Sequence, residues 1–206
     1  MVVIAVGGCT GTGKSTLCFG LQKVREVTIV QVDEYHNPTA LCPRIRLATL
    51  PWPDGLPPSF AARGEADFNV PAAIDWQALH GAILRAKRSE GTILIEGNLL
   101  YSQHLGALRV RSFCDAFVLL SADGRDPSVM ERLWRRKWQR SHLGKPSYRD
   151  RGVTAQEYQV YWESYVWPRW LEHGACCIPP VALRINSMHS AEQNCRTLLG
   201  TGWLDA

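Results

Sequence analysis

The residues best suited to chemistry form a short glycine-rich segment near the start of the chain. Residues 8–15 match G-x-x-x-x-G-K-[ST] and lie between a β-branched run and a helical pattern. Its glycines let backbone N–H groups face a phosphate, Lys14 adds positive charge, and the Ser15 hydroxyl can reach magnesium. The segment predicts an ATP site made of Gly8, Cys9, Thr10, Gly11, Thr12, Gly13, Lys14, Ser15 and Thr16.

Two acidic residues follow predicted strands. Asp33 comes just after residues 27–32, and Glu96 closes the apolar run 92–95. Ligands of open α/β sheets bind at the carboxyl ends of strands, so both acids are expected near the transferred phosphate. Asp33 is predicted to take the proton of an attacking hydroxyl or to hold the metal's water shell, with an N-cap as the alternative and Glu34 as a competing acid. Glu96 resembles a Walker B acid, with a structural strand-end acid as the alternative.

Basic residues gather before a segment rich in glycine and proline. Arg132, Arg136 and Arg140 recur every four residues, so on a helix they share one face. Residues 132–153 are therefore predicted to form a lid whose arginines close over a triphosphate and exclude water. A solvated cationic face is the alternative.

Aromatic side chains crowd residues 158–170, and core packing is the default interpretation of such residues at helical spacing. Phe68, which follows a long loop beside Asn69, is instead a candidate for stacking on a flat ring.

The elements that must position these residues follow from the pattern of apolar runs. Five buried strands are predicted at 2–6, 27–32, 92–95, 116–120 and 181–185, and helices at 14–24, 71–88, 127–140, 154–173 and 190–199. This alternation predicts an α/β fold, a three-layer sandwich with a five-stranded parallel sheet and helices on both faces. A proline-rich loop at 37–67 interrupts it, and its length is typical of a functional loop.

Composition narrows the class of protein. With 206 residues, 46% hydrophobic and 20% charged, the chain is expected to form one domain over residues 1–206. A net charge of +4 with localised arginines favours a phosphate-rich small ligand over nucleic acid. The cysteines show no metal-binding spacing, and neither a signal peptide nor a membrane span is recognisable. We expect a cytoplasmic protein with no membrane partner, as a monomer or weak homodimer.

Several segments resemble the nicotinamide riboside kinases and the related uridine/cytidine kinases, and they occur in the same order. The segment WESYVWP at 162–168 is the most similar to nicotinamide riboside kinases. The others are the P-loop, QVD at 31–33 with Tyr35 and Pro38, FNVP at 68–71 with Ala73, Ile74 and Asp75, ILIEG at 93–97, and Arg135, Arg136 and Arg140.

The resemblance implies a P-loop kinase-like fold and a reaction. The γ-phosphoryl group of ATP would pass, with Mg²⁺ as cofactor, to the 5′-hydroxyl of nicotinamide riboside for NAD synthesis. Lys14 and Asp33 would be catalytic, and the metal site would comprise Ser15, Asp33 and Glu96. The implied phosphate contacts are Arg136 and Arg140, the adenine-side loop is Asn186 and Ser187, and the substrate-side residues are Asp33, Tyr35, Phe68, Asn69, Arg136 and Glu163.

Two positions bear on the acceptor. Asn69 stands where the family usually has an aspartate that binds ribose hydroxyls, and Glu163 replaces a more common aspartate. Acids such as Asp33 and Glu163 near an aromatic ring would favour the cationic ring of nicotinamide riboside over a neutral uracil.

Other functions remain as alternatives. A uridine/cytidine kinase is one, and a nucleoside monophosphate kinase that holds its acceptor phosphate with Arg44, Arg46 and Arg63 is another. A regulatory NTPase is the alternative from a different class. The sequence has no N-K-x-D segment for reading guanine, which speaks against a GTP switch.

Overall fold

The computed structural model contains a five-stranded sheet in the order β2-β3-β1-β4-β5, with every neighbouring pair parallel. It describes residues 1–61, 66–88, 91–122, 124–141 and 146–205. The predicted α/β fold with a five-stranded parallel sheet is confirmed. The strands are β1 Val3–Gly8, β2 Val27–Gln31, β3 Thr92–Gly97, β4 Ala116–Ser121 and β5 Leu183–Asn186.

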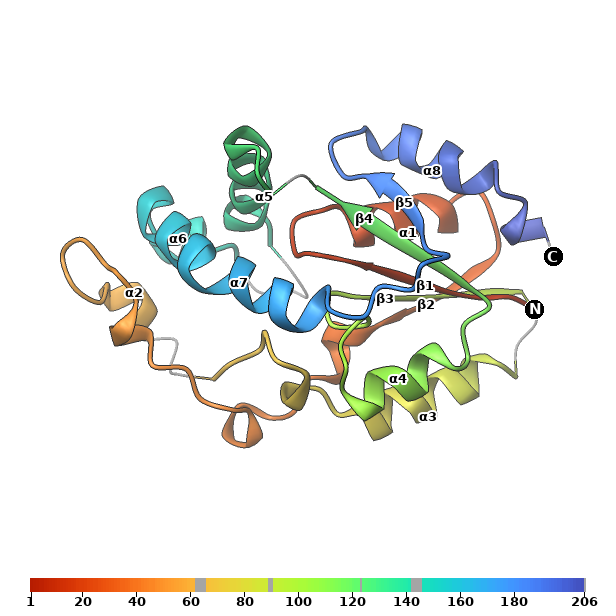
Figure 1. The fold of residues 1–206 in the computed structure, drawn as a ribbon, viewed down its shortest axis with the longest axis horizontal. Coiled ribbons are helices and arrows are strands. Elements are labelled where there is room, and N and C mark those ends of the chain that lie inside the picture. Colours follow the sequence, from red (N-terminus) through yellow and green to blue (C-terminus); the bar gives the residue numbers. More distant parts are fainter. Residues whose placement is uncertain (62–65, 89–90, 123, 142–145, 206) are drawn as a thin grey trace.

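Helices cover both faces of this sheet (Figure 1). Helices α1 and α8 lie on one face, and α3 and α4 lie on the other, which gives three layers. The helices are α1 Lys14–Gln22, α2 Pro58–Ala61, α3 Trp76–Ala86, α4 Leu105–Arg111, α5 Pro127–Gln139, α6 Ala155–Tyr161, α7 Trp167–Arg169 and α8 Ala191–Leu199. None of the helices in the described ranges is long and apolar enough to span a bilayer.

Alternate residues of the central strand β1 enter two separate cores. Val3 and Ala5 belong to the cluster that includes α3 and α4, whereas Ile4 and Val6 pack with residues of α1 and α8. Successive side chains of a strand point to opposite faces, so a strand covered on both sides must be apolar throughout. This arrangement explains the unbroken apolar run at the start of the chain.

The helix predicted at 71–88 begins later than expected. Pro71–Ala73 form a 3₁₀ turn, the chain is extended at Ile74, and α3 starts only at Trp76. The side chain of Asp75 accepts a hydrogen bond from the backbone N–H of Ala78 at 2.9 Å and so caps the helix. A local N-cap therefore fixes this start.

The helix predicted at 154–173 is present but irregular. A capping box of Thr154 and Glu157 starts α6, and π-helical segments Trp162–Val166 and Trp170–Gly174 flank the short α7. Pro168 lies within α7 and has no backbone N–H to donate, and a widened turn is one way to accommodate this loss. Helices α2 and α4 were not predicted.

The described part of the 37–67 loop is a packed substructure. An antiparallel bridge joins Arg44 to Ala66, and the backbone N–H of Asp67 donates to the carbonyl of Pro43 at 2.7 Å. Trp52 and Phe60 are buried with their ring centroids 4.9 Å apart, and Phe60 lies 5.0 Å from the ring of Tyr161. These apolar residues hold the loop against α6.

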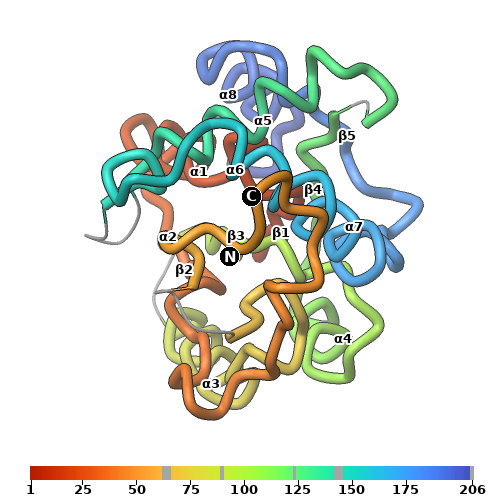
Figure 2. The backbone as a smooth tube through the Cα atoms, turned by 90° about the vertical axis from the view of Figure 1, so that its left-hand side faces the viewer, coloured from red at the N-terminus to blue at the C-terminus, as the bar shows by residue number. Residues whose placement is uncertain are grey.

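The carboxyl ends of the strands point toward α2, α5 and α6, away from the chain termini (Figure 1). Figure 2 looks onto this end, with the 37–61 segment on the near side, and α5 contacts α6 there. The glycine-rich segment leaves β1 at this end and enters α1. The fold therefore brings the P-loop, the predicted lid helix and the long loop to one end of the sheet.

Candidate active site

The glycine-rich segment forms a turn between β1 and α1. Gly13 adopts a left-handed conformation with φ of 96° at the N-cap of α1, and Lys14 and Ser15 are the first helical residues. Gly11 has φ of +82°, and a Cβ there would lie 2.5 Å from the carbonyl oxygen of Leu133 in α5. The geometry is that of a phosphate-binding turn at a helix N-terminus, where N–H groups lack helical partners.

The carbonyl of Cys9 holds this turn together. It accepts hydrogen bonds from the Thr12 hydroxyl at 2.7 Å and from Nζ of Lys14 at 3.0 Å. Burial raises the pKa of the Cys9 thiol to about 12, against a smaller lowering by Lys14, so this cysteine stays protonated at neutral pH. The Lys14 ammonium is thus already positioned beside the turn.

The acid at the end of β3 contacts the P-loop helix. Oε1 of Glu96 accepts a hydrogen bond from the Ser15 hydroxyl at 3.1 Å, because β1 and β3 pair with Val6 opposite Glu96. Burial raises the pKa of the Glu96 carboxyl, Lys14 lowers it, and the nearby negative charge of Asp33 raises it further. The structure therefore brings Ser15, Glu96 and Asp33 into one electrostatic cluster.

This cluster suits a magnesium ion that is held mainly by a nucleotide. Among the residues that the structure describes, no group of three or more His, Cys, Asp or Glu side chains forms a protein-only metal site. Mg²⁺ usually takes one or two carboxylates, several waters and phosphate oxygens, with a P-loop hydroxyl as a further ligand. A hydroxyl with two acids, Ser15 with Asp33 and Glu96, fits that donor set.

Asp33 and Glu34 have different surroundings. Asp33 lies in a 3₁₀ turn, Val32–Tyr35, directly after β2, and it lines a cavity. Glu34 is exposed and accepts a hydrogen bond from Nε2 of Gln31 at 3.1 Å. Of these two competing acids, Asp33 is the one beside the cavity.

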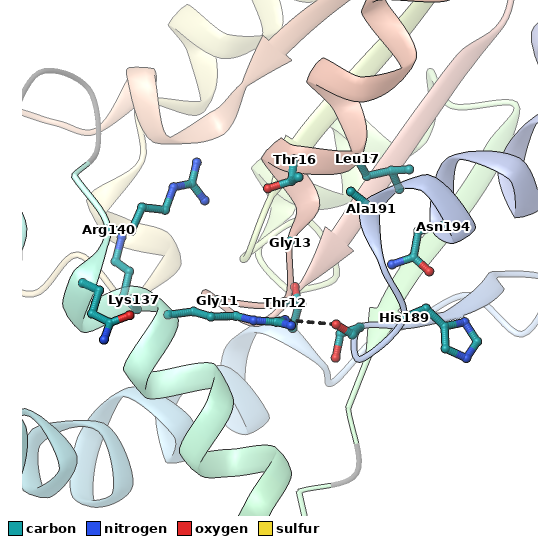
Figure 3. Close-up of a pocket in the computed structure, with 13 residues that line it drawn as sticks. Gly11, Thr12, Gly13, Thr16, Leu17, Lys137, Arg140, His189, Ala191 and Asn194 are labelled. Atoms are coloured by element: carbon teal, nitrogen blue, oxygen red, sulfur yellow. Dashed lines mark hydrogen bonds between the residues drawn. The ribbon is translucent and has the colours of Figure 1, made fainter.

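A cavity of about 400 Å³ lies beside the P-loop. Figure 3 shows Arg140 and Lys137 on one side of the P-loop and His189 and Asn194 on the other. A guanidinium N–H of Arg136 donates to the carbonyl of Ser187 at 3.1 Å, the bond drawn dashed in Figure 3. We call this space the donor cavity, and its lining is Gly11, Thr12, Gly13, Thr16, Leu17, Arg136, Lys137, Gln139, Arg140, Ser187, His189, Ala191 and Asn194.

A second cavity, of about 610 Å³, lies on the other side of Lys137 and Arg140, which line both. We call it the acceptor cavity. Its remaining lining consists of aromatic side chains, polar groups and a few others: Thr10, Asp33, His36, Thr39, Ser59, Phe68, Asn69, Asn98, Pro146, Tyr148, Arg151, Tyr158, Tyr161 and Val166.

The segment with Phe68 and Asn69 is held from both sides. Phe68 packs edge-on against His36 with ring centroids 5.2 Å apart, and Nδ2 of Asn69 donates to the Tyr161 hydroxyl at 3.4 Å. Buried Asp67 accepts from the backbone N–H of Asn69 at 2.9 Å and from the hydroxyl of Tyr165. Burial and the bond to Asp67 raise the pKa of Tyr165, which keeps this hydroxyl a donor.

Some predicted site residues lie away from both cavities. Tyr35 is half-buried against the core, and its carbonyl accepts from the N–H of Asp75. Glu163 is exposed and accepts from Gln159 at 2.8 Å. The side chain of Asn186 accepts from the N–H of Met188 at 2.9 Å, whereas its neighbour Ser187 lines the donor cavity.

The predicted basic site residues also differ in whether they line a cavity. Arg136 and Arg140 line the donor cavity, whereas Arg132 is exposed and lines neither cavity. Arg44 and Arg46 are exposed and also line neither. Arg63 and residues 142–145 of the predicted lid lie outside the described residues.

Sequence reasoning missed several lining residues, among them Tyr148, Arg151 and Tyr161. Tyr148 and Arg151 lie in the part of the chain predicted as a lid, and Tyr161 was interpreted as core. The signal for Tyr148 was weak, because one aromatic residue between charged residues has no periodicity. Tyr161 is buried, so its pattern is that of a core residue even though its hydroxyl faces Asn69.

Comparison with solved structures supports the fold. No protein-family model matches the chain, and no curated protein matches its sequence. A provisionally named fructose transport system kinase from Silicibacter sp. TM1040 is similar over 89% of both chains, with 18% identity and a TM-score of 0.57. A sugar kinase from Janibacter sp. HTCC2649 is similar over 100% of this chain and 95% of its own, with 18% identity and a TM-score of 0.54.

A gluconokinase from Sinorhizobium meliloti 1021 is also similar, over 97% of this chain and 90% of its own, with 15% identity and a TM-score of 0.50. At such identities the likeness concerns the fold. The chain has the fold of P-loop small-molecule kinases.

Proposed function

We propose that this protein is a small-molecule kinase that transfers the γ-phosphoryl group of ATP to a hydroxyl of an acceptor. The observation that carries the proposal is a pair of cavities that share Lys137 and Arg140 beside the P-loop. Gly11 lines the donor cavity and Thr10 lines the acceptor cavity, so adjacent P-loop residues face the two spaces. Phosphoryl transfer requires such an arrangement, because donor and acceptor must meet in line at the γ-phosphate.

The roles of the charged residues follow from their places. Asp33 accepts the proton of the attacking hydroxyl, since it is the carboxylate that lines the acceptor cavity. Lys14, Arg136 and Arg140 stabilise the charge of the transferring group. Ser15, Asp33 and Glu96 would hold magnesium, which would neutralise charge on the transferring phosphate.

For the acceptor we propose nicotinamide riboside, phosphorylated at its 5′-hydroxyl. The support is the sequence resemblance together with an aromatic lining, Phe68, Tyr148 and Tyr161, that suits a flat ring. Asn69 is positioned to hydrogen-bond a ribose hydroxyl, although without the charge of an aspartate.

Uridine or cytidine is the second candidate. The exposed position of Glu163 favours it, because the carboxylate expected beside a cationic ring lies outside the cavity. A monophosphate acceptor held by Arg44 and Arg46 lacks support, since neither side chain lines the acceptor cavity.

The test is ADP formation by purified protein with Mg-ATP and a panel of acceptors. The panel contains nicotinamide riboside, uridine, cytidine, their monophosphates, fructose and gluconate, the sugars being suggested by the names of the similar structures. ADP is expected only when an acceptor is present, and more rapidly with nicotinamide riboside than with uridine or cytidine. ATP turnover that is the same with and without every acceptor would instead favour a regulatory NTPase.

A further inference from the structure

The acceptor cavity carries more positive than negative charge. The charged residues among its described lining are the cations Lys137, Arg140 and Arg151 and a lone carboxylate, Asp33. Lys137 and Arg140 also line the donor cavity, where a triphosphate would neutralise them. Arg151 lines only the acceptor cavity, so bound ATP leaves its charge uncompensated.

A backbone carbonyl and an aromatic ring hold Arg151 in place. Its Nε donates to the carbonyl of Ser147 at 3.2 Å, and its guanidinium carbon lies 4.5 Å from the centroid of the Tyr148 ring. Within the described ranges no carboxylate forms an ion pair with it. The hydrogen bond of Nε and the contact with the Tyr148 ring thus preorganise the side chain. Its terminal N–H groups are suited to bidentate binding of an anion.

Arg149 lies on the same 3₁₀ turn, Arg149–Arg151, and provides a contrast. Arg149 forms an ion pair with Asp150 at 3.3 Å and lines neither cavity. The two arginines are two residues apart, yet of the two only Arg151 lines the acceptor cavity and has no ion-pair partner among the described residues.

We infer that Arg151 binds an anionic group, a carboxylate or a phosphate, of the acceptor, so that the site takes acidic acceptors more readily than relatives without that group, nicotinamide riboside included. The inference rests on the proposed function, because it takes this cavity to be the acceptor site. The carboxylate of Asp33 repels an anion, so the group is expected beside Arg151 and away from the accepting hydroxyl. The aromatic rings of Tyr148, Tyr158 and Tyr161 contact the body of the acceptor.

The test uses pairs of compounds that differ in charge. Nicotinic acid riboside and nicotinamide riboside compare a carboxylate with an amide, and fructose 6-phosphate and fructose compare a phosphate with a hydroxyl. The wild-type protein is expected to favour the acidic member by about tenfold in kcat/KM, as one charge-assisted contact would give. The pair that shows the preference identifies the anion.

Arg151→Gln is expected to raise the KM for the acidic acceptor and so to abolish this preference. The KM for ATP should stay unchanged. Arg149→Gln is the matched control and should keep the preference. If Arg151→Gln is poorly folded, Arg151→Lys retains the charge without the planar fork and should keep part of the preference. Equal rates for both members of each pair, or an Arg151→Gln effect on the KM for ATP, would overturn the inference.

Binding measured by calorimetry without ATP separates this inference from the proposed function. If acidic compounds bind in a manner that depends on Arg151 but no compound yields ADP, the kinase proposal fails and the anion site stands. If neutral compounds are phosphorylated rapidly and acidic ones neither bind nor react, the kinase stands and the anion site fails.

Discussion

The hydroxyl of Ser15 donates a hydrogen bond to Oε1 of Glu96 at 3.1 Å and so joins the first turn of α1 to the end of β3. Both residues are buried, and Lys14 lies close enough to lower the pKa of Glu96. Burial nevertheless outweighs Lys14 and raises that pKa, which means that the ionised carboxylate costs folding free energy. A charge kept at such a cost is typical of a functional site.

Glu96→Gln should therefore separate stability from activity. The amide keeps an oxygen for Ser15 but carries no charge, so the melting temperature of the metal-free protein is expected to rise. Turnover should fall on the order of 100-fold, because the magnesium side of the site loses a negative group. Thermal unfolding in EDTA and steady-state kinetics check the two effects, and a lower melting temperature with unchanged turnover would refute both.

Arg136 and Arg132 form a matched pair on α5. Arg136 lines the donor cavity and donates to the Ser187 carbonyl, whereas Arg132, one turn earlier, lines neither cavity. Arg136→Gln is expected to raise the KM for ATP about tenfold, as the loss of one charge-assisted contact would. Arg132→Gln should leave that KM unchanged, and equal effects of the two substitutions would show that α5 acts only through its overall charge.

Gly11→Ala should damage both the P-loop and its packing on α5. The added Cβ would lie 2.5 Å from the Leu133 carbonyl at a position with φ of +82°, so the free energy of unfolding should fall by about 1–3 kcal/mol and ATP binding should weaken. Gly152→Ala is the control, because Gly152 has φ of +79° with open space around it. A denaturant titration in which the two variants lose equal stability would mean that the contact with Leu133 has no effect.

Tyr165→Phe removes the hydroxyl that donates to buried Asp67. The carboxylate loses a donor in a buried place, so the free energy of unfolding should fall by about 1–3 kcal/mol. Because Asp67 also holds the backbone of Asn69, the KM for the acceptor should rise while the KM for ATP stays constant. An increase in the KM for ATP alone would show that this pair does not position the acceptor side.

The donor side of the site was predictable because its signals are local. The P-loop is contiguous in sequence, Asp33 follows the apolar strand β2, and Glu96 lies near the end of the apolar strand β3, which parallel pairing places beside β2. Ser15 meets Glu96 across 81 positions of sequence because of the register between β1 and β3. Strand pattern and topology together are enough to infer this proximity.

The acceptor side was less predictable because its lining comes from distant segments. Asp33, Phe68, Tyr148 and Tyr161 line one cavity in the fold, where the 37–67 loop packs against α6. Helical periodicity also explains the position of Glu163. Tyr158, Tyr161 and Tyr165 share the buried face, and a residue two positions after Tyr161 points away from that face.

The most direct measurement compares wild-type protein with Asp33→Asn for Mg-ATP binding and for acceptor-dependent ADP formation. Asp33→Asn is expected to bind Mg-ATP within a few-fold of wild type, because the P-loop and Arg136 still line the donor cavity and Ser15 and Glu96 remain on the magnesium side. Its acceptor-dependent turnover should fall by about 100-fold or more, as expected for a general base. Near-normal turnover by Asp33→Asn, or wild-type ATP consumption that no acceptor stimulates, would contradict the account.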